Sequence, residues 1–205
     1  MSRLAACVVG VLVLVAAGCG LSTDNEPEGI ANTTVDSTAQ DRTSNFAVPY
    51  GDTEPVAVWF LATDDEGIHL KQTQRRVAAP PTPENHLDAL LQQPPDVFER
   101  DDGIWTAIPA NARLLEAPVQ RGQVLVINLP DQVYLELHGR GAQGAFAQLT
   151  YTATEIDGVK AVQFERDGTV FSALDGSGQA TTSALDRDDF ADFAPLDPDD
   201  PVSPQ

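Results

Sequence analysis

The sequence predicts a single α+β domain in which a mixed, mostly antiparallel sheet packs against two main helices. Three observations predict this class: apolar runs of strand length, turn sequences that join several of these runs into hairpins, and two segments whose apolar residues recur at helical spacing. Strands and helices do not alternate regularly, which argues against a doubly wound parallel sheet. We expect the domain to span residues 55–175 of the 205-residue chain.

The domain begins with two predicted strands. Val56–Leu61 is a nearly continuous apolar run, which is typical of a central strand covered on both faces. Asp64-Asp65-Glu66-Gly67 then turns the chain, and Ile68–Val77 follows as a partner strand with one face in water.

The first helix should begin at Thr82. This residue can act as the N-cap, and Pro83 suits the first helical position. One face of the helix is apolar and consists of Leu87, Leu90 and Leu91. Two consecutive prolines, Pro94 and Pro95, should end it.

The remaining elements complete the α+β pattern. They are, in chain order, a short extended piece at Ile104–Pro109, a hairpin of Arg113–Val119 and Gln123–Leu129, a second helix at Ala142–Ile156, and a hairpin of Val159–Glu165 and Thr169–Leu174. The second helix places Phe146, Leu149, Ala153 and Ile156 on one side.

The first 18 residues have the features of a secretory leader. Arg3 precedes Leu4–Gly18, an apolar run that as a helix would be about 22 Å long, short of the ~30 Å hydrocarbon core of a membrane. Ala16-Ala17-Gly18 followed by Cys19 resembles the lipobox of bacterial lipoproteins, in which the cysteine carries a diacylglyceryl group and becomes the first mature residue. We therefore predict lipid attachment at Cys19 and a location on the outer face of the cell membrane; an uncleaved anchor or an ordinary secreted protein is the alternative.

The charge of the chain limits its partners. Lys and Arg number 12 against 31 Asp and Glu, for a formal charge of -19. Such an acidic chain has no basic face for nucleic acid, and an anionic membrane surface would repel it, so acyl chains must hold it there. Removing the leader discards Cys7, so Cys19 would be the one cysteine left and neither a disulfide nor a cysteine metal site could form.

Polar segments flank the predicted domain. Residues 19–54 are rich in Ser, Thr, Asn, Asp, Glu and Pro, and we expect a flexible tether there. Residues 176–205 form an acidic tail rich in Pro and Asp, in which Leu185–Phe193 could be a short docked helix.

One segment imitates a dinucleotide-binding motif. Gly139-Arg140-Gly141-Ala142-Gln143-Gly144 matches G-x-G-x-x-G, and Glu165 stands where a ribose-binding acid would. A dinucleotide fold needs several parallel strands and crossovers, and here the strand ending at Glu165 enters a tight hairpin. We interpret the glycines as shaping a loop into the second helix and expect no cofactor.

Other reactive side chains form no recognisable constellation. His69, His86 and His138 lack metal-ligand spacing, and Ser177 is not in a nucleophile elbow. The acidic runs are better interpreted as solvated surface, although a carboxylate pair brought together only in space stays open. Trp59 and Trp105 lie in apolar runs and are more typical of core than of a sugar-binding platform. We expect no catalytic residue and no metal site.

Several segments in order resemble the GerMN family, the sporulation and spore-germination domain of bacterial lipoproteins. They are Val58–Leu61, Leu87–Pro94, Thr106–Pro109, Leu114-Leu115, Val124–Leu129, Gln148–Glu155, Gly158–Phe164 and Asp167-Gly168. The resemblance covers about residues 56–175, and the apolar residues 133–137 stand where it implies a loop before the second helix. It implies a non-catalytic envelope module, related in some members to ring-building folds, and assigns no active-site residue.

Three hypotheses for function follow. The first is a lipid-anchored module that binds envelope proteins, with exposed strand edges available for a partner strand. The second is a module for cell-wall glycan or a small molecule, with a pocket lined by Trp59, Trp105 or Tyr134. The third is a divergent hydrolase whose carboxylates the sequence does not identify.

Overall fold

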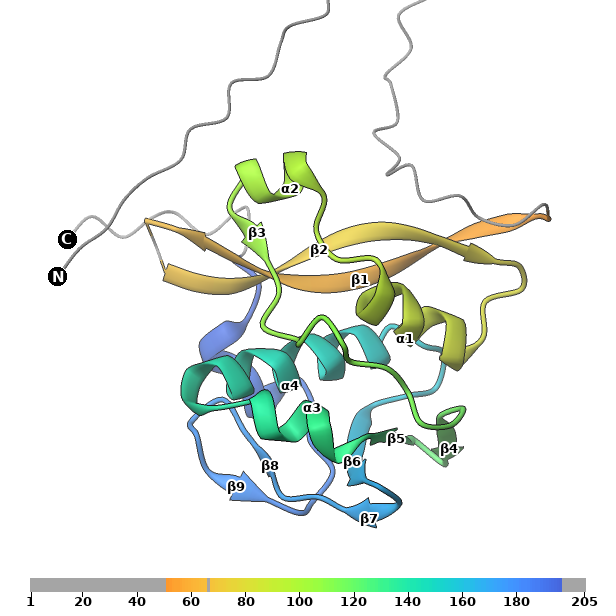
Figure 1. Cartoon of the computed structure of the whole chain (residues 1–205), viewed down its shortest axis with the longest axis vertical. Helices are drawn as coiled ribbons and strands as arrows, with labels where there is room; N and C mark the ends of the chain where they lie inside the picture. Colours follow the sequence, from red (N-terminus) through yellow and green to blue (C-terminus); the bar gives the residue numbers. More distant parts are fainter. Residues whose placement is uncertain (1–50, 66, 197–205) are drawn as a thin grey trace, which may run out of the picture. The chain divides into compact units, whose positions relative to one another are not determined.

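A long antiparallel hairpin forms the first part of the domain (Figure 1). The structure is a computed structural model and describes residues 51–65 and 67–196. Strands β1 (Thr53–Asp64) and β2 (Gly67–Ala78) pair along their whole length, and β3 (Ile104–Trp105) pairs with the other side of β1. Consecutive β1 residues are buried, namely Val58, Trp59, Phe60 and Leu61. The prediction of a central strand covered on both faces is confirmed.

Helix α1 (Pro83–Gln92) begins and ends as its sequence predicts. The Thr82 hydroxyl accepts a hydrogen bond from Asn85 N at 3.2 Å, and Thr82 N donates to Asn85 Oδ1 at 2.7 Å. This reciprocal capping box satisfies two main-chain donors that a helix start leaves unpaired. The three leucines of its apolar face are all buried.

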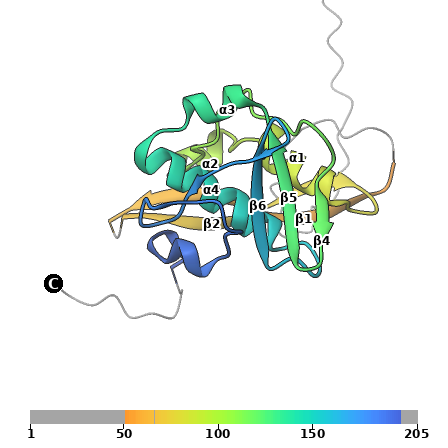
Figure 2. The ribbon, with the colours of Figure 1, turned by 90° about the horizontal axis from the view of Figure 1, so that it is seen from below.

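A crossover links the two halves of a second, four-stranded sheet. Strands β5 (Val124–Leu129) and β6 (Ala161–Arg166) are parallel neighbours, and α4 (Gly139–Ala153) lies in the connection between them. Figure 2 shows β4 (Val119–Arg121), β5 and β6 side by side. Helix α4 packs against both β1 and β6, so it lies between the hairpin and this sheet (Figure 1). An antiparallel sheet and a mixed sheet with helices packed on them confirm the α+β class.

The edge of β1 beyond β3 is closed by helix side chains. The imidazole Nε2 of His86 lies 2.7 Å from Ala57 O, and Trp59 N donates to the Thr152 hydroxyl at 3.0 Å. Gln148 Nε2 donates to Trp59 O at 3.4 Å. Because these main-chain groups already have partners, this edge does not offer them to an added strand. Among the described residues, β2 and β3 are the outer strands of the first sheet, and β4 and β7 are those of the second.

Several predicted strands are shorter in the structure. Instead of Arg113–Val119, the first hairpin strand is only β4, three residues long. Pro118 has no N–H to donate to a sheet ladder, which limits pairing on that side. Before it, the chain is joined to β5 by a main-chain bond from Leu115 N to Asn128 O at 3.0 Å and by a side-chain bond from Asn128 Nδ2 to Glu116 Oε1 at 2.8 Å.

The predicted loop before the second main helix is wrong. Residues 133–137 lie mostly in a further helix, α3 (Asp131–Glu136), because Val133 and Tyr134 are buried on its inner side. Helix α4 then begins at Gly139 and ends at Ala153, three residues earlier at each end than predicted. The glycine run therefore belongs to the helix.

The predicted second hairpin divides into two. Strand β7 (Thr169–Val170) pairs with the end of β6, whereas β8 (Ala173–Leu174) pairs with β9 (Ala180–Thr181). The chain leaves β6 after Phe171, whose N–H still donates to Phe164 O at 2.9 Å. The single strand Thr169–Leu174 of the prediction is thus wrong, because its two ends have different partners.

Residues 183–193, here called the C-terminal strap, complete the core. They include a 3₁₀ helix, η1 (Asp188–Phe193), and three buried apolar side chains: Leu185, Phe190 and Phe193. The apolar core thus continues past Asp175. The predicted leader, the predicted lipid attachment site Cys19, the predicted tether up to residue 50 and the predicted tail from 197 onward lie outside the described residues.

Candidate interaction surface

The three histidines lie on separate elements. His86 is buried and supports the edge of β1, whereas His69 Nε2 lies 3.6 Å from Asp64 Oδ2 on the hairpin. His138 precedes α4 as its N-cap and is exposed. In the part of the chain that the structure describes, no group of three or more His, Cys, Asp or Glu side chains is placed to hold a metal ion.

The glycine run has a packing role. A Cβ on Gly144 would stand 2.8 Å from Leu61 Cδ1, so the missing side chain allows α4 to approach β1 closely. Helix α3 separates the run from β5, whereas a dinucleotide site needs the glycines directly after a strand. The interpretation as a loop is wrong, and the rejection of a dinucleotide site rests on this topology.

The aromatic residues of the glycan hypothesis do not form one pocket. Trp59 is 8% exposed and its indole donates to Glu155 Oε1 at 3.0 Å. Tyr134 is 6% exposed and its hydroxyl donates to Glu165 O at 2.8 Å. Trp105 is half-buried and donates to the Thr63 hydroxyl. With two of the three rings sealed in the core, they cannot act together as a stacking platform.

The groups with perturbed pKa values also lie apart. Burial raises the pKa of Tyr134 on α3 and that of Tyr151 on α4. Burial, with the nearby charge of Glu84, raises the pKa of Asp88 on α1. The hydroxyl of Ser177 lowers the pKa of Asp175 by hydrogen bonding to its carboxylate. Ser177 thus shapes a turn, and these groups form no acid–base pair.

A short helix that contributes nothing to the core is the most unusual feature of the domain. Helix α2 (Val97–Asp101) has no buried residue, and it projects beside the hairpin in Figure 1. Val97 is 52% exposed and Phe98 is 67% exposed. Monomeric proteins expose single apolar residues often, but two neighbours on a fixed helix are typical of a contact surface.

A buried arginine holds this helix in place. Arg75 of β2 is 3% exposed, and its Nη1 and Nη2 donate to the two carboxylate oxygens of Glu99 at 2.8 and 2.7 Å. Its Nε also donates to Gln93 O at 3.0 Å. A two-point arginine–carboxylate pair fixes both distance and orientation. The helix is therefore tied to the sheet although it packs no side chain into it.

The start of α2 is capped in the same way as that of α1. The Asp96 carboxylate accepts from Glu99 N at 2.9 Å, and Asp96 N donates to Glu99 Oε2 at 2.9 Å. The elements predicted from the sequence include no helix between Pro95 and Ile104, and α2 corrects this. The signal was available, because Asp96 and Glu99 have the spacing of a capping box.

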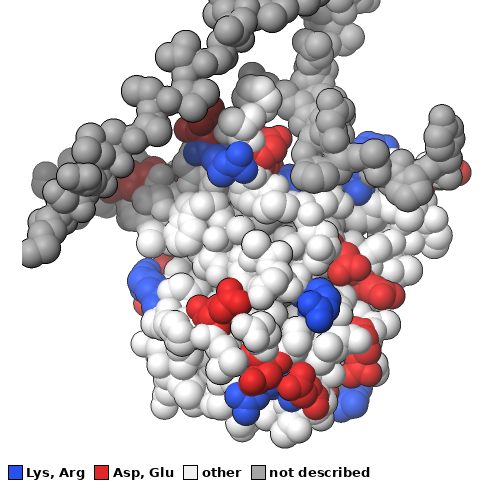
Figure 3. All heavy atoms as spheres, viewed as in Figure 1, with Lys and Arg blue, Asp and Glu red and all other residues white. Residues whose placement is uncertain are grey.

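Exposed carboxylates follow α2 in the chain and also lie in the turn next to it. Asp101 and Asp102 follow the helix and are exposed, and Asp65 is exposed in the neighbouring β1–β2 turn. The two segments meet where Thr63 N donates to Gly103 O at 3.2 Å. Figure 3 shows acidic and basic side chains gathered where α2 projects at the top of the view. We call Val97, Phe98, Asp65, Asp101 and Asp102 the α2 surface.

Solved structures similar to this chain come from bacterial proteins. The tandem GerMN domains of the sporulation protein GerM from Bacillus subtilis share 15% identity with a TM-score of 0.49, covering 62% of this chain and 43% of that one. The first GerMN domain of GerM shares 14% identity with a TM-score of 0.46, covering 65% and 98%. A Clostridium perfringens protein described as a lipoprotein shares 17% identity with a TM-score of 0.44, covering 73% and 97%.

The family comparison is the decisive one. A comparison with curated proteins found no match. The model of the Germane family, described as sporulation and spore germination, matches residues 57–171, which is more than half of the chain. That range contains both main helices and the strands from most of β1 to β7. The chain therefore belongs to the Germane family of sporulation and spore-germination domains.

Proposed function

We propose that the chain is a lipid-anchored lipoprotein outside the cytoplasm, whose Germane domain binds protein partners in the cell envelope and catalyses no reaction. The family membership supports a role in a spore-related process. The α2 surface is the observation that carries the binding role, because a fixed helix without buried residues presents two apolar side chains to solvent.

The anchor is supported by the sequence around Cys19. Among residues 51–65 and 67–196, no helix is long and apolar enough to cross a membrane. Two or more acyl chains give durable attachment because each buried methylene contributes about 0.8 kcal/mol.

The anchor is tested with two matched variants in the cells that produce the protein. Cys19→Ser should move the protein from the membrane fraction to the soluble fraction, whereas Cys7→Ser should leave it in the membrane. Mass spectrometry should detect a diacylglyceryl mass on Cys19 of the wild-type chain. A wild-type Cys19 that carries no lipid would remove the anchor from the proposal.

The binding role is tested by crosslinking in intact cells. A photo-crosslinking amino acid at position 98 should capture a defined envelope protein, and the same group at position 135 should not. Leu135 is a suitable control because it is a large apolar residue on α3 and is 59% exposed. Equal capture at both positions, or none at position 98, would count against the α2 surface as the contact.

A further inference from the structure

We propose that the α2 surface binds a basic amphipathic helix of another protein, with the apolar face of that helix on Val97 and Phe98 and its Lys or Arg side chains beside the carboxylates. This inference rests on the proposed function and names the chemistry of the partner. We choose this one kind of partner because it matches both the exposed apolar side chains and the charges beside them.

The apolar side chains of the α2 surface are held in place in solvent before a partner binds. An exposed phenylalanine on a mobile loop would lose conformational entropy on binding, but here the capping box and the Arg75–Glu99 pair have already fixed the helix. A rigid aromatic side chain surrounded by polar residues is typical of the centre of a protein interface. The partner must therefore offer apolar surface at this point.

The charges on and beside α2 determine which charge the partner must carry. Of the acidic residues on and beside α2, Glu99 is paired with Arg75, and Asp96 caps the helix. Arg100 is exposed and its Nη1 donates to Pro95 O, but a bond to a neutral carbonyl leaves its positive charge in place. The carboxylates of Asp65, Asp101 and Asp102 make no hydrogen bond or ion pair that the structure records among the described residues. These three carboxylates outnumber the one cation, so the net charge of the surface attracts a cationic partner and repels an anionic one.

The same charges argue against other occupants. An anionic lipid surface or a nucleic acid would bring phosphates next to three carboxylates. A second copy of the chain would bring another -19 charge and the same acidic surface. Neither objection applies to a basic amphipathic helix.

The inference is tested with three designed peptides and the purified full chain. One is a helical Leu/Lys peptide with an apolar face, the second has Glu in place of Lys, and the third has Ser in place of Leu. Fluorescence anisotropy should detect binding of the Leu/Lys peptide alone, and added salt should weaken it because the contact is partly electrostatic.

Matched variants locate the contact. Phe98→Ala and the double variant Asp101→Lys, Asp102→Lys should each weaken binding roughly tenfold. Leu135→Ala, and Asp157→Lys with Asp192→Lys, should leave it unchanged; the last pair makes the same change in net charge at two exposed positions elsewhere. Circular dichroism confirms that each variant is folded.

The inference is overturned if the Leu/Lys peptide does not bind, if the Glu peptide binds as well, or if the control variants weaken binding equally. Self-association that Phe98→Ala abolishes, measured by sedimentation, would also overturn it and would make a second copy the occupant. Crosslinking at position 98 together with failure of the peptide test would leave the proposed function standing and reject only the basic helix.

Discussion

Leu185 and Val162 exchange two main-chain hydrogen bonds, at 2.8 Å from Val162 N and 2.9 Å from Leu185 N. They form a one-residue bridge on the side of β6 where β7 pairs farther along. Leu185 lies beyond the family match, which ends at residue 171. The C-terminal strap therefore extends the sheet edge and the core of this particular chain.

Phe190→Ala should destabilise the whole domain. Phe190 is 0% exposed and belongs to the core, so removing its ring should lower the free energy of unfolding by about 3–5 kcal/mol. The urea midpoint of the full chain measures this. Leu196→Ala is the control because Leu196 is 43% exposed, and its effect should stay within about 0.5 kcal/mol. Similar midpoints for Phe190→Ala and wild type would mean that the strap is not part of the cooperative unit.

Two glycines of α4 should respond to alanine in opposite ways. At Gly141 a Cβ meets nothing within 4 Å, so Gly141→Ala should stabilise the domain by up to about 1 kcal/mol through helix propensity. At Gly144 a Cβ would lie 2.8 Å from Leu61 Cδ1, and Leu61 is buried. Overpacking costs about 1–3 kcal/mol, so Gly144→Ala should be destabilising in net. Thermal unfolding of the pair checks the sign, and stabilisation by both variants would show that Leu61 can move aside.

Gln148→Leu should be costly although it places an apolar residue in the core. The side-chain oxygen of Gln148 accepts from Ala107 N at 2.9 Å, and its amide donates to Trp59 O and the Thr106 hydroxyl. Leucine would leave these three partners without Gln148, and each buried polar group left unpaired lowers the free energy of unfolding by about 1–3 kcal/mol. Urea unfolding measures the loss. Gln132→Leu on the exposed side of α3 should change little, and a harmless Gln148→Leu would contradict this role.

Glu99→Ala should destabilise the whole domain and not only α2. It leaves the Arg75 guanidinium buried without its charge partner, and breaking such a pair costs about 3–5 kcal/mol. Asp101→Ala removes an exposed carboxylate and should have little effect. Hydrogen exchange of α2 and urea unfolding together distinguish local from global loss. Equal stability of the two variants would show that Arg75 finds other partners.

Alkaline pH should weaken the fold through two tyrosines. Burial raises the pKa of Tyr134 and Tyr151 above the ordinary tyrosine value of 10.0, so the folded state favours the protonated phenol. Their contribution to stability is complete below pH 10 and is lost as the pH rises through the folded-state values. Tyrosinate absorbance followed against pH should show two late titrations, and Tyr134→Phe should remove one of them. Titration of both near the ordinary value would contradict their burial.

Local signals predicted the first half of the fold. Thr82 and Pro83 define the start of α1 because a helix cap depends on neighbours three residues away. The apolar run of β1 needs cover on both faces wherever it lies, so its central position also followed from the sequence. Helix α2 was missed because its side chains are exposed, and apolar periodicity detects only buried faces.

Long-range contacts account for most of what sequence reasoning did not find. The parallel pairing of β5 with β6 depends on a crossover through α3 and α4, which no local pattern specifies. The α2 surface joins Asp65 to residues 97–102, and its anchor Arg75 comes from another strand. A basic residue in a half-exposed strand predicts a solvated charge, and only the fold reveals that it is buried.

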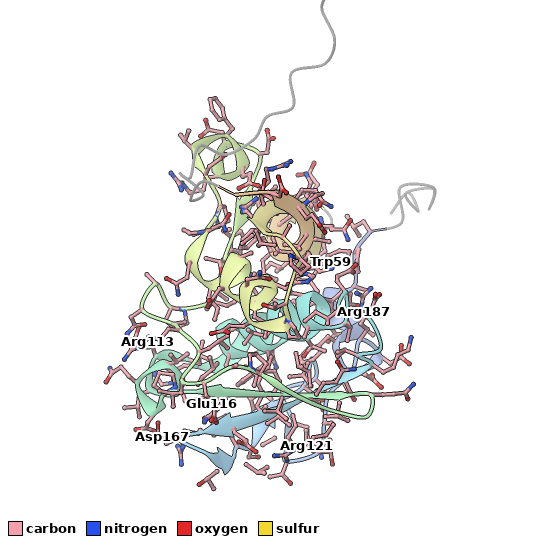
Figure 4. The ribbon with its side chains drawn as sticks, turned by 90° about the vertical axis from the view of Figure 1, so that its right-hand side faces the viewer. Trp59, Arg113, Glu116, Arg121, Asp167 and Arg187 are labelled. Atoms are coloured by element: carbon pink, nitrogen blue, oxygen red, sulfur yellow. The ribbon has the colours of Figure 1, made fainter. Side chains whose placement is uncertain are left out.

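Trp59 lies where β1, the end of α4 and the C-terminal strap meet. The Arg187 guanidinium stands 5.6 Å from the centre of the Trp59 ring and donates to the Thr154 hydroxyl at 2.7 Å, while the Tyr151 ring packs 5.4 Å away (Figure 4). Release of the strap removes the cation from this ring and admits water, which shifts indole emission to longer wavelength. The fluorescence of Trp59 therefore reports detachment of the strap. In a Trp105→Phe variant the emission of the other indole is absent.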